Sequence, residues 1–334
     1  MKGFVKAVIG IFILFLVILF INTNFNSYYR EIFSIIGINI ILVTSLNISN
    51  GFTGLFSLGH AGFMAVGAYT SALLDLPLDK KAMLLPNLPY WLGHISWPFL
   101  PSVIMAGFMA AFFALLIGYP VLRLKGHYLS VATLGFMVIV RVIINNTPNL
   151  TRGAIGINNI PNYTNIWWVY FWVVITVYVL WRIVNSSYGR AFLAIREDYI
   201  AASLSGVNLT KYKILSFSIG AFFAGVAGAL WAHQITAITP RAFSFVTTFN
   251  IVVMLVIGGM GSISGSILSA FFLTLLPELM RPLEEGMVIF GHQLPQLYGL
   301  TQLIMAALLI LVMIFRPKGL MGDREISFKT IFWK

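Results

Sequence analysis

The sequence contains no cysteine and few charged residues. Of its 334 residues, 9% are Asp, Glu, Lys or Arg, against roughly a quarter in an average soluble domain. The missing cysteines exclude a disulfide framework and thiolate chemistry. The low charge excludes a water-soluble fold, because a soluble protein of this length needs far more charge to cover its surface. In place of charge the chain has hydrophobic residues, which make up 59% of it.

The hydrophobic residues form long runs that predict an all-α, polytopic membrane bundle in one transmembrane domain over residues 1–334. A spanning helix needs about 20 apolar residues, and most of the runs approach that length. Two short runs, Thr247–Ile257 and Ile267–Met280, flank a glycine-rich break, so we expect eight to ten spans, with a re-entrant half-helix as the alternative for the first of them. The ten expected helices are Phe4–Ile21, Ile32–Ile48, Leu55–Leu74, Pro98–Val121, Leu129–Ile144, Ile166–Val184, Tyr212–His233, Thr247–Ile257, Ile267–Met280 and Tyr298–Phe315.

The basic residues near the helix ends predict the orientation. With ten spans that start inside, 14 of the 21 Lys and Arg residues fall on the cytoplasmic side. We therefore expect a multi-pass protein of the cell membrane with both termini in the cytoplasm. The first run ends in polar residues without a small-residue cleavage site, so it is interpreted as a retained span. The net charge of +11 follows from this orientation and requires no nucleic acid partner.

The sequence does not contain the motifs on which several kinds of catalysis and ion-driven transport depend. No Gly-x-x-x-x-Gly-Lys-Ser/Thr phosphate loop and no Gly-x-Ser-x-Gly nucleophile motif occurs. The five histidines are scattered and predict no metal site. No acidic residue lies at the centre of an expected span, which argues against a carrier driven by a proton or sodium gradient. The sequence therefore predicts no catalytic residue, no metal and no cofactor on this chain.

Two glycine-rich segments interrupt the apolar runs. Both contain Gly-x-x-Gly-x-x-Ser, as Gly51, Gly54 and Ser57 and as Gly258, Gly261 and Ser264. Such segments predict broken helices whose freed backbone groups face a substrate path, and two matching breaks suggest an internal repeat. The alternative is that the small residues only let helices pack closely. The ten-span count places both breaks on the cytoplasmic side, which a strictly inverted repeat would not.

Rows of small residues in Tyr212–His233 predict close helix packing alone, and we expect Gly225 in one row to tolerate alanine.

The longest expected cytoplasmic segment is 186–213. Within it, apolar residues at 191, 195, 199 and 202 have the spacing of one helical face, and Gly206 can end the helix in a left-handed cap. The pattern predicts a short amphipathic helix between two spans. It could lie on the membrane surface or bind a soluble partner.

Four blocks of the sequence form a recognisable series. They are GFTGLFSLGHAGF with GAYT (51–63, 67–70), TLGF with Arg141 and TRGAIGI (133–136, 151–157), GRAF with AIRED (189–192, 194–198) and RPKGLMG (316–322). In this order they resemble the family of branched-chain amino-acid ABC transporter permeases, over roughly residues 32–322. The stretch AIRED and the chain length favour its LivM-type subunit over the shorter LivH-type partner. Arg152 departs from the family, in which glycine is common there.

The resemblance implies a subunit of an ATP-driven importer of leucine, isoleucine and valine. Implied partners are a homologous LivH-type permease, two LivG/LivF-type ATPase subunits that bind ATP and magnesium, an extracytoplasmic solute-binding protein and membrane lipid. The implied substrate path involves the two breaks and nearby polar groups: Gly54, Ser57, His60, Tyr69, Asn145, Gly258, Gly261 and Ser264.

The resemblance also makes the amphipathic segment a coupling helix for the ATPases, although the family's Glu before the Ala pair is absent. The residues implied in ATPase coupling are Arg190, Arg196, Glu197, Asp198, Ala201, Ala202 and Gly206. Three alternatives remain from the sequence: a related permease for urea or short amides, a stand-alone channel or gradient-driven carrier, and a membrane-embedded enzyme.

Overall fold

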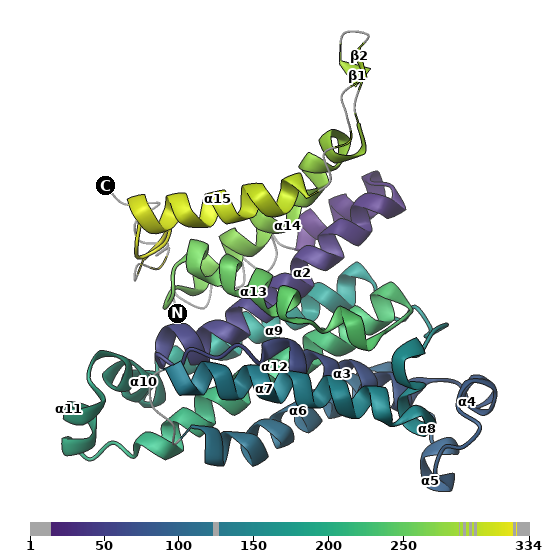
Figure 1. Cartoon of the computed structure of the whole chain (residues 1–334), viewed down its shortest axis with the longest axis horizontal. Helices are drawn as coiled ribbons and strands as arrows, with labels where there is room; N and C mark the ends of the chain where they lie inside the picture. The colour runs from purple at the N-terminus through teal and green to yellow at the C-terminus, as the bar shows by residue number, and fades with distance from the viewer. Residues whose placement is uncertain are drawn as a thin grey trace.

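The computed structural model describes residues 15–122, 127–286, 288–289, 292–293, 296, 299–322 and 325. In this part of the chain the fold is helical, with one antiparallel hairpin of two-residue strands (Figure 1). The longer elements are α2 (Ser27–Asn47), α3 (His60–Asp75), α6 (Phe99–Val121), α7 (His127–Asn146), α9 (Ile166–Val184), α12 (Leu209–Ile235), α13 (Phe245–Gly258), α14 (Ile263–Glu285) and α15 (Leu300–Phe315). The shorter ones are η1 (Ile48–Phe52), α4 (Leu78–Leu84), α5 (Tyr90–Gly93), α8 (Pro148–Thr151), η2 (Gly153–Ile155), α10 (Ser187–Glu197), α11 (Tyr199–Leu204), η3 (Pro240–Ala242), β1 (Val288–Ile289) and β2 (His292–Gln293).

The spans agree with the expected number. In the described residues, 7 helices are long and apolar enough to cross a membrane, or 8 if α3 and α4, bent by 116°, form one span. Two shorter apolar helices, Phe15–Asn24 and α15, add to these. Expected helix Phe4–Ile21 lies partly outside the described residues. α13 alone has 14 residues and is about 21 Å long, so it needs the preceding η3 turn to reach a span of 19 residues, Pro240–Gly258.

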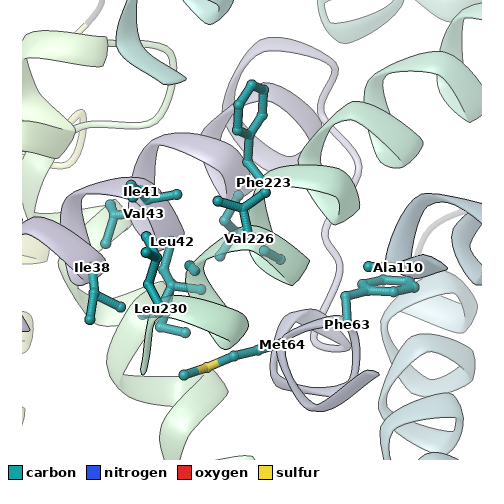
Figure 2. Close-up of a cluster of buried hydrophobic side chains, with 14 of the residues drawn as sticks. Ile38, Ile41, Leu42, Val43, Phe63, Met64, Ala110, Phe223, Val226 and Leu230 are labelled. Atoms are coloured by element: carbon teal, nitrogen blue, oxygen red, sulfur yellow. The ribbon is translucent and has the colours of Figure 1, made fainter. Parts of the chain in front are cut away.

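Helix α12 lies at the centre of the bundle and packs against α2, α3 and α6. Figure 2 shows the apolar side chains that fill this core, from Ile38 and Leu42 of α2 to Phe63 of α3 and Leu230 of α12. Small residues bring the backbones of α3 and α12 into contact. A Cβ atom on Gly67 would lie 2.1 Å from the carbonyl oxygen of Gly225, and one on Gly228 would lie 2.0 Å from that of Met64. The expected packing role of the small residues in α12 is therefore confirmed.

The short elements gather at two ends of the bundle. Helices α10 and α11 lie at one end, and α4, α5 and α8 lie at the other (Figure 1). At the α4–α8 end, an isolated bridge between Ile157 and Ile238 ties the loop after η2 to the loop before η3. Both glycine-rich segments lie at the α10–α11 end. The first contacts α10, and the second is joined to the first.

Candidate functional site

The first break follows α2. The helix widens into the π-helical turn η1, and the chain then runs without regular structure from Thr53 to Gly59 before α3 begins. Gly54 has φ +73°, a left-handed conformation that a side chain resists. The buried amide of Asn50 fixes the segment, donating to the Ser57 carbonyl at 3.1 Å and accepting from the Ser57 N–H at 3.2 Å. The expected helix Leu55–Leu74 was thus wrong at its start, because the break occupies Leu55–Gly59.

The second break lies between α13 and α14. Gly259 and Gly261 have φ +114° and +97°, so both predicted glycine-rich breaks are confirmed. The segment after α15 covers this break: the N–H groups of Leu320 and Met321 donate to the last carbonyls of α13, at 2.8 and 3.2 Å. The carboxylate of Glu325 accepts from the N–H groups of Ile263 and Ser264, at 2.6 and 3.0 Å, where a helix N-terminus favours negative charge.

The two breaks are joined through Asn47. This side chain is fully buried, accepts a hydrogen bond from the Gly261 N–H at 2.9 Å, and donates to the Ser262 carbonyl and the Ser266 hydroxyl, each at 2.8 Å. Gly51 makes room for the contact, because a Cβ there would lie 1.7 Å from Asn47 Oδ1. Both breaks therefore lie at the same end of the bundle, as the span count predicted.

Helix α10 reaches the first break through Arg196. Its Nη1 donates to the Gly51 carbonyl at 3.1 Å, and its other nitrogens bind Glu197. A Cβ on Gly54 would lie 3.1 Å from Arg196 Cγ. A continuous set of contacts thus runs from α10 to the first break and, through Asn47, to the second.

The expected coupling segment is two helices rather than one. Asp198 is extended, at φ −153°, and its carboxylate caps α11 by accepting from the N–H groups of Ile200 and Ala201. The side chains of Asp198 and Arg196 therefore form hydrogen bonds with backbone groups of this chain. Arg190, Glu197 and Ala201 are exposed, whereas Ala202 is buried. Gly206, at φ +83°, ends α11 in the predicted left-handed cap.

The polar residues predicted for the substrate path are dispersed. Ser57 in the first break and His60 at the start of α3 are buried, and His60 Nε2 lies 3.0 Å from the Ser45 hydroxyl. Tyr69 is buried against Phe243, and Asn145 is exposed near the far end of α7. Ser264 binds Glu325. None of the eight predicted residues lines either of two cavities in the described part of the chain.

The larger cavity, of about 380 Å³, lies among α2, α3, α12, α13, α14 and α15. Sequence reasoning missed its polar residues Asn39, Asn250 and Glu278. In the sequence, each of these residues is marked only by being a polar side chain within an apolar run.

A buried polar cluster also escaped prediction. Asp75, the last residue of α3, lies 2.7 Å from His233 of α12, and both side chains are fully buried. Ser102 of α6 donates to the same carboxylate oxygen at 2.8 Å. His233 Nδ1 lies 2.8 Å from the Pro161 carbonyl, so it donates there and presents Nε2 to Asp75. The cluster joins three helices and a loop at the α4–α8 end.

Alanine in place of Gly54 or Gly261 is expected to strain the backbone of the break and to lower the activity of the protein. The left-handed backbone makes a Cβ cost about 1–2 kcal/mol at each position. The measurement is the rate, for each variant in the assembled protein, of the transport that the sequence resemblance implies. Gly225 cannot serve as the tolerant control that the sequence suggested, because a Cβ there would lie 2.6 Å from the Ala106 carbonyl oxygen. Gly135 of α7 replaces it, since nothing lies within 4 Å of a Cβ there. Equal losses in Gly54→Ala and Gly135→Ala would contradict the prediction.

Comparison with known families gives one match over most of the chain. Residues 28–313 match the family described as branched-chain amino acid transport system, permease component. No solved structure matches the chain significantly.

Individual relatives agree with this match. The high-affinity branched-chain amino acid transport system permease protein LivM of Salmonella typhimurium is 35% identical over 85% of this chain and 68% of its own length. The protein of the same name in Escherichia coli has the same identity and coverage. The LivH permease protein of Salmonella typhimurium is 25% identical over 83% of this chain and 89% of its own length.

Proposed function

Because the chain belongs to the branched-chain amino acid transport permease family, we propose that it is the LivM-type membrane subunit of an importer for leucine, isoleucine and valine. The substrate crosses beside a LivH-type permease, an extracytoplasmic binding protein delivers it, and two ATPase subunits supply the energy. This chain itself performs no catalysis and binds no cofactor.

The observation that carries the proposal is the set of contacts from α10 through Arg196 to both breaks. In an ATP-driven importer, hydrolysis on one subunit must change the access to the substrate in another, which requires an element with two arrangements that both subunits bias. In this proposal the two breaks are that element, because glycine adopts left-handed and right-handed backbone conformations about equally well. Arg196 contacts the first break directly, and Asn47 connects it to the second.

The exposed face of α10 and α11 is the docking surface for an ATPase. Its apolar residues Tyr199, Ile200 and Leu204 have exposed fractions of 45%, 55% and 85%, and Arg190 and Glu197 add exposed charge. Helices α10 and α11, which carry this surface, lie at one end of the bundle in Figure 1. The α10–α11 end is accordingly cytoplasmic, and both chain termini are cytoplasmic with it. This orientation agrees with the excess of basic residues predicted on that side.

Uptake into vesicles tests the proposal. Vesicles that contain this chain with a LivH-type permease, ATPases and binding protein are expected to concentrate radiolabelled leucine, isoleucine or valine only with ATP. This chain alone is expected to concentrate nothing, because concentrating a solute tenfold costs about 1.4 kcal/mol and it has no phosphate loop. Uptake by the lone chain on a proton or sodium gradient would contradict the assembly, and uptake of urea but none of these amino acids would contradict the substrate.

The same complex with Ser203→Cys tests the orientation and the docking surface. The chain has no cysteine of its own, so the new thiol on exposed α11 is its single label. Crosslinking of this thiol to an ATPase is expected. Labelling of intact cells by an impermeant reagent from outside would contradict the orientation.

A further inference from the structure

The cavity of about 380 Å³ lies away from both breaks. Its α2 residues run from Ile32 to Leu42, short of the break at the end of that helix, and its α14 residues run from Leu273 to Glu278, well past the start of that helix. Its volume falls in the range of about 300–1,000 Å³ that is usual for small-molecule sites.

The wall of the cavity is mainly aliphatic and flexible. It includes Ile35 and Leu42 of α2, Met64 of α3, Ile251 and Met254 of α13 and Leu273 of α14. Such side chains gain by burying a branched hydrocarbon group, at about 0.8 kcal/mol for each CH₂ removed from water. Methionine is unbranched and adapts to irregular shapes, so one wall accepts several aliphatic side chains.

A few polar groups interrupt this wall. Asn39 donates to the Thr274 hydroxyl at 2.9 Å, and its amide oxygen accepts no hydrogen bond from the described residues. The amide of Asn250 has no hydrogen-bond partner in the described part of the chain. One oxygen of Glu278 accepts from the Tyr28 hydroxyl, and no described residue donates to the other. The cavity thus offers a carboxylate and an amide oxygen as acceptors and an amide N–H₂ as a donor.

We infer that this cavity binds the branched-chain amino acid during its passage. The aliphatic wall takes the side chain, Glu278 and the Asn39 oxygen take the ammonium group, and the Asn250 N–H₂ group takes the carboxylate. The inference rests on the proposed function and adds the residues that determine the substrate class.

Protection of a thiol tests binding directly. Thr247 lines the cavity, and its hydroxyl binds the Ala242 carbonyl of its own segment, so cysteine there removes none of the groups assigned to the ligand. In the purified complex, leucine at ten times its Kd is expected to slow modification of Thr247→Cys by a small thiol reagent about tenfold. Glycine, which has no side chain, is expected to slow it far less. Val246→Cys is exposed, does not line the cavity and is the control whose rate leucine leaves unchanged.

Filling the cavity gives the second measurement. Met254→Trp is expected to abolish the protection at Thr247→Cys and to lower leucine uptake about tenfold, which is about 1.4 kcal/mol. The matched control is Met313→Trp on α15, where the side chain is 57% exposed, and its uptake is expected to match the unsubstituted complex.

Three outcomes separate the inferences. If the unsubstituted complex takes up none of the three amino acids, the proposed function fails. If it takes up leucine but leucine protects no thiol in the cavity and Met254→Trp transports normally, the function holds and the cavity inference is overturned. Modification that is slow without leucine and accelerates only when lipid is stripped would identify an acyl chain as the occupant and also overturn it.

Discussion

Asn47→Leu is expected to abolish ATP-dependent uptake and to lower the unfolding temperature of the complex in detergent. Asn47 is the buried side chain that joins the two breaks, with three hydrogen bonds of 2.8–2.9 Å. Leucine has a similar size but no polar atom, so the Gly261 N–H loses its partner at a buried position. Each buried group left unpaired costs about 1–3 kcal/mol. The breaks then no longer move together, and uptake stops even where the protein still folds.

Two further variants make this prediction sharper. Asn47→Asp keeps the acceptor for the Gly261 N–H but turns an oxygen toward the Ser262 carbonyl, so it is expected to impair uptake as well. Asn146→Leu is the matched control, because Asn146 is exposed on α7 and binds only a carbonyl of its own helix. Normal uptake by Asn47→Leu would show that the two breaks work independently.

The second large effect is expected at the buried pair of Asp75 and His233. Removing one member of a buried pair costs about 3–5 kcal/mol, whereas replacing both by apolar residues of similar volume is often neutral. Asp75→Leu and His233→Leu are therefore each expected to lower stability strongly. The double variant is expected to be more stable than either single one.

A double-mutant cycle measures this coupling. The four proteins are compared by unfolding in detergent, and the interaction energy is the departure of the double variant from the sum of the single ones. Ser34→Ala is a matched control, since that buried hydroxyl binds only a carbonyl of its own helix. Additive losses in the double variant would mean that Asp75 and His233 act separately.

The sequence was sufficient to predict the helices, because apolar runs of spanning length have one solution in lipid. The two breaks were predictable as well, since glycine at Gly54 and Gly261 is needed where φ is positive. The helix ends were less certain: the expected helix Ile267–Met280 is too short at both ends, because α14 runs from Ile263 through Pro277 and Pro282 to Glu285.

The connections between distant segments could not be predicted. Asn47 and Gly261 are 214 residues apart, and an isolated Asn in an apolar run does not identify its partner. The resemblance implied Arg196 in ATPase coupling, but no local pattern indicated that its side chain also turns inward to the Gly51 carbonyl. The cavity depends on side chains from six helices, so no local pattern signals it. The roles assigned to Ser57, His60, Tyr69 and Asn145 in the substrate path stay predictions.

The contact between Glu325 and α14 has a consequence for the order of events during synthesis. Ser264 and Glu325 are 61 residues apart, and at 5–20 residues per second the ribosome needs about 3–12 s to add that stretch. During this time α13 and α14 have emerged or are emerging while the N–H groups at the start of α14 still lack their acceptor. The second break therefore reaches its final form only after Glu325 has been translated, later than the two helices that flank it.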